Sequence, residues 1–113
     1  MQTIEQKLKD YITDIEAALD SGRNLDSWIV FNPVTAEALN FSFNKNSQVE
    51  KAFHSRVVNA QLFSEHDAVK LAAKIRVGKY GEKCIAMALK DALSLALNNE
   101  KETLVKIKLM QGA

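Results

Sequence analysis

The spacing of the apolar residues changes along this chain, from every third or fourth residue to every second residue and back again. The first spacing is typical of a helix with one buried stripe, and the second of a strand whose side chains alternate between two faces. Because both patterns occur in one chain of 113 residues, we predict a single α+β domain over residues 1–113. We also expect the apolar residues of both halves to share one interior.

The first segment is typical of an amphipathic helix. Thr3 followed by Gln6 fits a capping box at its start, and Gly22 fits the left-handed residue that ends many helices. The apolar stripe between them consists of Ile4, Leu8, Tyr11, Ile12, Ile15 and Leu19. The other faces are acidic, and we predict an acidic interaction face made of Asp10, Asp14, Glu16 and Asp20.

Two short runs that follow, 28–31 and 39–43, are rich in aromatic and β-branched residues, and the second alternates apolar with polar. The turn 32–35 between them contains Pro33, so we predict an antiparallel hairpin that forms a small sheet packed on helices.

The next segment is less clear. Ser47 and Glu50 fit a capping box, which predicts a short helical turn bearing Val49, Ala52 and Phe53. Residues 55–63 fit either a strand or a helix, and we favour a strand.

The second half contains two predicted helices. Ser64 and Asp67 mark the start of the first, which is expected to stop at Gly78, and the second is expected from Glu82 to Leu97. Residues 103–110 fit either a strand, with Val105, Ile107 and Leu109 alternating with lysines, or a continued helix. We favour the strand, which gives the order α-β-β-(α)-β-α-α-β.

The sequence contains no recognisable catalytic or metal-binding motif. The two histidines, His54 and His66, lie outside known catalytic signatures, and with a single cysteine they cannot supply a closed zinc site. Cys84 could be a reactive thiol in the first turn of the predicted second helix, but free cysteines are usually buried. We therefore expect no cofactor, no metal and no enzymatic activity, and a thiol-dependent enzyme or redox sensor at Cys84 is the least favoured alternative.

Charge is unevenly distributed, although the net charge is only +1. Basic residues cluster around the two predicted helices of the second half, and Tyr80 adds a ring to them. This cluster is a candidate interaction face, either for a protein or, as the alternative, for the phosphates of a nucleic acid. It consists of Lys70, Lys74, Arg76, Lys79, Tyr80 and Lys83.

The helix expected from Glu82 to Leu97 has apolar residues on more than one face. Met87, Leu95 and Leu97 are therefore candidate contacts of a homodimer. No segment is long and apolar enough to cross a membrane, and no secretion signal is recognisable, so we expect a cytoplasmic protein. By elimination, we expect a small non-enzymatic binding protein, an adaptor, inhibitor or assembly factor, that contacts another protein.

Overall fold

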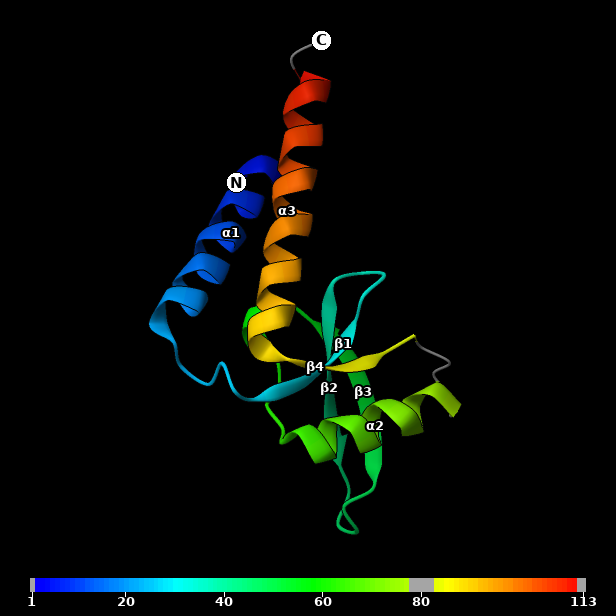
Figure 1. The fold of residues 1–113 in the computed structure, drawn as a ribbon. Helices are drawn as coiled ribbons and strands as arrows, with labels where there is room; N and C mark the ends of the chain where they lie inside the picture. The colour runs from blue at the N-terminus through cyan, green and yellow to red at the C-terminus, as the bar shows by residue number, and fades with distance from the viewer. Residues whose placement is uncertain (1, 78–82, 112–113) are drawn as a thin grey trace.

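The computed structural model describes residues 2–77 and 83–111. Within these ranges, three α-helices pack against a four-stranded antiparallel sheet, so the expected α+β class is confirmed (Figure 1). The order of the elements differs from the expected one. Along the chain they are α1 (Ile4–Ser21), β1 (Trp28–Asn32), β2 (Glu37–Phe43), β3 (Val49–Ser55), the 3-10 turn η1 (Val57–Asn59), α2 (Glu65–Val77), β4 (Ile85–Ala88) and α3 (Leu89–Gln111).

The strands lie in the order β3-β2-β1-β4, and each pairs antiparallel with its neighbour. The predicted hairpin is confirmed as β1 and β2, with Val30 opposite Leu39 and Phe31 opposite Ala38. The buried Asn32 side chain holds the turn, because its Oδ1 accepts a hydrogen bond of 2.9 Å from the backbone N–H of Val34.

Local capping signals mark both ends of α1 and the start of α2. The Thr3 hydroxyl accepts a 3.1 Å hydrogen bond from the N–H of Gln6, and Gly22 ends α1 with a φ of 67°. The Gln6 side chain donates to Asp10 instead of returning to Thr3, so the cap is not reciprocal. At α2, the Ser64 hydroxyl accepts from the N–H of Asp67 at 3.2 Å, as expected.

The predicted helical turn around Val49 is wrong, because Val49–Ser55 is strand β3. Ser47 does not cap a helix. It lies in the β2–β3 turn with a φ of 61°, and its N–H donates to the Asn44 carbonyl. Pairing with β2 gives these residues backbone hydrogen bonds along their length, which outweighs the weak helical signal of a single turn.

The strand expected at 55–63 is also wrong. After β3 the chain forms η1 and then runs irregularly to Phe63, which makes a single antiparallel bridge to Trp28. Side chains hold the segment against β2 in place of a ladder. The backbone N–H of Phe41 donates to the Gln61 side chain at 2.7 Å.

The expected helix from Glu82 to Leu97 combines two elements. Glu82 lies outside the described residues, Ile85–Ala88 is strand β4, and α3 begins only at Leu89. β4 pairs along the free edge of β1, with Met87 opposite Ile29. A short apolar run fits a strand as well as a helix, and here the neighbouring edge determined the outcome.

The strand favoured at 103–110 is wrong as well, since α3 continues to Gln111. Each added residue of an existing helix gains a backbone hydrogen bond at once, whereas a strand needs a partner. In the described part of the chain, the sheet contains β3, β2, β1 and β4 only, and none of these strands pairs with residues 103–110.

Instead of one shared interior, the described residues form two core clusters on opposite faces of the sheet. Ile29 and Phe31 point to one face and Val30 to the other, as the alternation of a strand requires. The first cluster joins the sheet to α1, η1 and α3: Tyr11, Ile15, Ile29, Phe31, Ala38, Val57, Leu89, Ala92, Leu93 and Ala96. The second joins it to α2: Val30, Leu39, Phe41, Ala72, Ile75 and Cys84.

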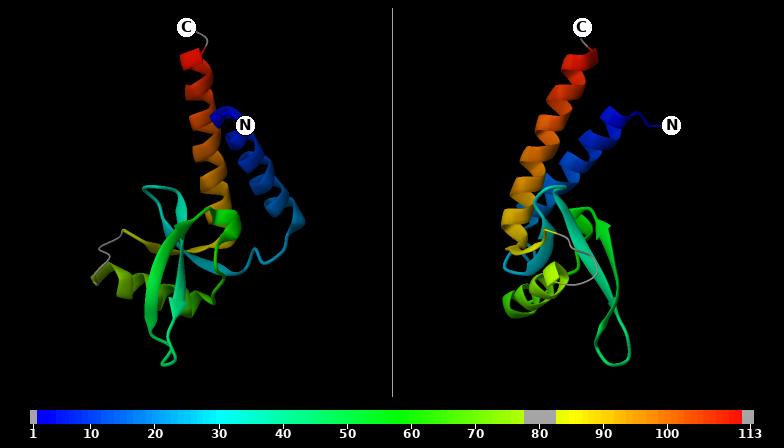
Figure 2. Two further views of the ribbon diagram at one scale, coloured as in Figure 1. Left: turned by 180° about the vertical axis from the view of Figure 1, so that it is seen from behind. Right: turned by 90° about the vertical axis from the view of Figure 1, so that its right-hand side faces the viewer.

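The molecule is elongated, with extents of 53 × 31 × 24 Å, because α3 reaches well beyond the sheet (Figures 1 and 2). α1 packs against α3. In the right-hand view of Figure 2, the first turns of α1 and the last turns of α3 diverge away from the sheet. The two helices therefore form an arm whose outer part is open.

Candidate functional site

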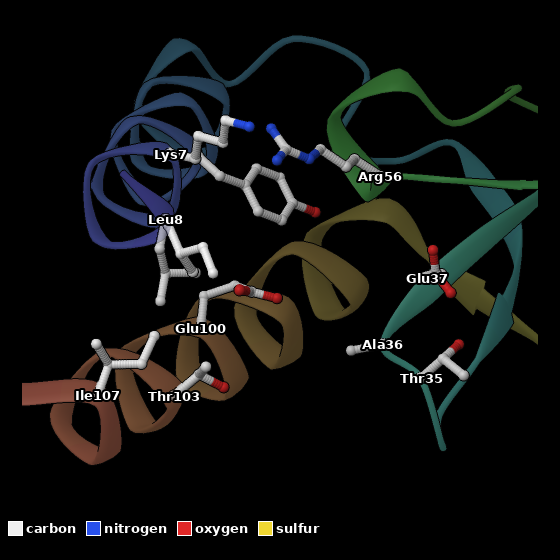
Figure 3. A pocket seen from close by; sticks show the side chains of 11 residues that line it. Lys7, Leu8, Thr35, Ala36, Glu37, Arg56, Glu100, Thr103 and Ile107 are labelled. Carbon is white, nitrogen blue, oxygen red and sulfur yellow. The ribbon is translucent and has the colours of Figure 1, made fainter. Parts of the chain in front are cut away.

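The clearest candidate site is a groove of about 420 Å³ between the two helices of this arm, which we call the α1–α3 groove. Its size lies in the range of natural ligand sites. Figure 3 shows side chains converging on it from both helices, from the β1–β2 turn, from Glu37 at the start of β2 and from Arg56 just before η1. The lining residues are Ile4, Lys7, Leu8, Tyr11, Thr35, Ala36, Glu37, Arg56, Glu100, Thr103 and Ile107.

The apolar part of the groove continues the buried stripes of both helices. Ile4 lies about three turns before the fully buried Ile15 on the same face of α1, yet its side chain is 74% exposed. Ile107 lies about three turns after the fully buried Ala96 on α3 and is only half-buried. Both stripes thus extend beyond the sheet that covers them, which leaves core-type side chains facing solvent.

Tyr11 anchors the deep end of the groove. Its hydroxyl accepts a 3.1 Å hydrogen bond from the buried N–H of Val57, and the Arg56 guanidinium lies 4.5 Å from its ring centroid. Burial is the main cause that raises the pKa of Tyr11 above its ordinary 10.0, and the charge of Glu100 adds to it. The phenol is therefore neutral at physiological pH and acts here as a fixed support for η1.

Charged groups of both signs surround the apolar surface. In Figure 3, Lys7 and Arg56 reach toward the same end of the groove, and Glu100 points in from α3. Glu37 lies on the sheet side, and one of its carboxylate oxygens is 3.6 Å from Nδ1 of His54. The groove thus has an apolar floor and a charged rim.

Of the predicted basic face, the structure describes three lysines. Lys70 and Lys74 are exposed one turn apart on α2, and Lys83 is exposed just before β4. Lys79 and Tyr80, and the side chain of Arg76, lie outside the described residues. Lys70 and Lys74 border a second groove, between α2 and β2, which is described below.

The predicted acidic face lies on the exposed side of α1, away from its apolar stripe. Asp14 and Asp20 are exposed, and Asp10 accepts hydrogen bonds from the side chains of Gln2 and Gln6. Glu16 lies 3.9 Å from the ammonium of Lys101 and so links α1 to α3. At least one of the four acidic residues thus contributes to the contact between the two helices.

The three candidate dimer contacts are separated by the structure. Met87 in β4 and Leu97 in α3 are partly buried against the first core cluster. Leu95 remains 46% exposed on the outer side of α3. Leu95 is therefore the most exposed of the three, with just under half of its surface open to solvent.

The groups considered for chemistry are dispersed. Cys84 is fully buried in the second core cluster and precedes a strand, so it lacks the helix N-terminus on which a reactive thiol was predicted. His66 is exposed in the first turn of α2. No group of three or more potential metal ligands is found among residues 2–77 and 83–111.

No helix in the described part of the chain is long and apolar enough to cross a membrane.

The groove was not predicted from the sequence because its walls come from opposite ends of the chain. The available signal was the alternative helical pattern at 103–110, which places Leu104 and Ile107 on the stripe that begins at Leu89. Continuing that stripe would have predicted an apolar face too long for the rest of the domain to cover.

No protein family, curated protein or solved structure matches this chain.

Proposed function

We propose that this chain is a non-enzymatic binding protein that holds an apolar segment of a partner protein in the α1–α3 groove. An adaptor, an inhibitor and an assembly factor would all use such a surface. The observation that carries the proposal is the exposure of Ile4 and the half-burial of Ile107 on stripes that are fully buried closer to the sheet. Apolar surface of this kind gains free energy when a partner removes it from water.

The form of the groove favours an amphipathic helix as the bound segment. Two diverging helices leave a trough in which a third helix can lay its apolar side, as in other helix-in-groove complexes. Lys7, Arg56 and Glu100 would then contact polar residues at the edges of that helix and determine its direction.

The test selects binding peptides from a displayed random library and compares two variants. Ile4→Glu/Ile107→Lys places charge on both walls of the groove, leaves the net charge unchanged and suits the dipoles at both helix ends. Full burial of an isoleucine contributes about 1.5–3 kcal/mol, so we expect a combined loss of roughly 2 kcal/mol, or about 30-fold in affinity.

Val69→Lys/Leu95→Glu is the matched control, because it charges two half-exposed apolar residues outside the groove. Selected peptides should bind this control as tightly as the unmodified protein in a fluorescence anisotropy titration. The proposal would be refuted if the selection yields no binding peptide, or if the selected peptides bind both variants as tightly as they bind the unmodified protein. Self-association abolished by the groove variant, in a sedimentation experiment, would assign the groove to a second copy instead.

A further inference from the structure

A second groove lies on the other side of the sheet, between α2 and the end of β2, and we call it the α2–β2 groove. Its volume is about 560 Å³. α2 contributes one face to it, because Asp67, Lys70, Leu71 and Lys74 follow one another at spacings of three, one and three residues. It shares no lining residue with the α1–α3 groove.

The opposite wall is aromatic. Phe43 leaves 41% of its surface exposed, and its ring centroid lies 6.5 Å from that of the buried Phe41. Phe63, which lines the same groove, stacks edge-on against Phe41 with a centroid distance of 6.2 Å. The three rings form a continuous apolar wall, of which the groove exposes the two ends.

The charge on the α2 wall is positive and is not neutralised from within. Lys70 and Lys74 form no ion pair with any residue in the described ranges, although Asp67 lies only one turn before Lys70. Two lysines against one aspartate give this wall a net charge of one positive unit. An occupant with carboxylates would complement it, and an occupant with basic groups would be repelled.

We infer that the α2–β2 groove binds a short extended segment of another protein in which acidic and apolar residues alternate. In an extended segment, successive side chains point to opposite sides, and neighbouring side chains on the same side lie about 6.6–6.8 Å apart. Lys70 and Lys74 are separated by one helical turn, about 5–6 Å between their Cβ atoms. One side of the segment thus places its carboxylates on the lysines, and the other side places its apolar residues on Phe43 and Phe63.

A single-stranded nucleic acid is the competing occupant, because lysines beside aromatic rings also suit phosphates and stacked bases. The exposure of the rings argues against it, because stacked bases need open aromatic faces and Phe43 alone of the three rings is more than one-third exposed. A peptide needs only one apolar anchor and two counter-charges.

The experiment titrates the full chain with a fluorescein-labelled peptide in which glutamate alternates with leucine. Two further peptides replace glutamate by lysine, or leucine by serine. We expect the first peptide to bind with a Kd below about 1 mM, and the other two to bind at least about tenfold more weakly. Amide chemical shifts should change at Phe43 and Leu71 and stay constant at Ile4 and Ile107, which separates this site from the α1–α3 groove.

Lys70→Glu/Lys74→Glu should weaken the peptide at least about tenfold, since two attractions become repulsions. Lys106→Glu/Lys108→Glu is the matched control, because it makes the same change in net charge on exposed residues of α3. Phe43→Ser tests the aromatic wall and should weaken binding without unfolding the protein, as judged by circular dichroism.

Each remaining outcome overturns the inference. Absence of binding by the alternating peptide removes the site, and equal loss in both lysine variants shows a non-specific charge effect. Tighter binding of an oligothymidine, lost in Lys70→Glu/Lys74→Glu, assigns the groove to nucleic acid.

Discussion

The hydrogen bond between Tyr11 and Val57 makes a quantitative prediction about stability. The Val57 N–H donates to the Tyr11 hydroxyl at 3.1 Å, and Val57 is fully buried, so water cannot replace the acceptor. Tyr11→Phe removes only the oxygen and leaves the ring in place. A buried donor left without a partner costs about 1–3 kcal/mol, and we expect the free energy of unfolding to fall by that amount. For a domain of this size, 1 kcal/mol corresponds to a fall in Tm of about 4 °C.

Urea denaturation followed by circular dichroism measures the loss, and hydrogen exchange of the Val57 amide locates it. Arg56→Ala is the control, because it removes the stacking on the Tyr11 ring and leaves the hydrogen bond. An exposed cation–π contact contributes about 0.5–1 kcal/mol, so this variant should lose less. A loss below about 0.5 kcal/mol in Tyr11→Phe, with an unchanged exchange rate at Val57, would refute the reasoning.

Four further outcomes are expected. Burial raises the pKa of Tyr11 in the folded protein above its ordinary 10.0, so the unfolded chain releases this proton at a lower pH than the folded protein does. The free energy of unfolding should therefore fall as the pH rises above 10. Urea denaturation at several pH values should show a smaller fall in Tyr11→Phe than in the unmodified protein. Leu93→Ala should lower the free energy of unfolding by about 2–5 kcal/mol, because Leu93 is fully buried in the first core cluster. Leu95→Ala is the control, and in the same assay this change at a half-exposed residue should cost under about 1 kcal/mol. Gly22→Ala should cost about 1–2 kcal/mol in thermal unfolding through its positive φ alone, since an added Cβ meets no atom within 4 Å. Maleimide should label Cys84 only after denaturant is added, and rapid labelling of the native protein would contradict its burial.

The candidate sites were only partly visible in the sequence. Lys70 and Lys74 follow from helical spacing on α2, and the structure confirms that both are exposed on one side of that helix. Their aromatic neighbours Phe43 and Phe63 come from other segments, and no local pattern connects them to α2. The α1–α3 groove was not predicted, because Ile4 and Ile107 meet only through packing between the first helix and the last.

By itself, the sequence determined the elements whose signals are local. The helix after Thr3, the hairpin around Pro33 and the start of α2 at Ser64 depend on caps, turn residues and periodicity within a few positions. Tertiary structure decided the segments whose patterns fit two conformations. Val49–Ser55 and Ile85–Ala88 became strands because the edges of β2 and β1 were open to them, and 103–110 stayed helical because no strand lay beside it. A helix forms its backbone hydrogen bonds within one segment, whereas a strand forms them with another strand, which the local sequence does not identify.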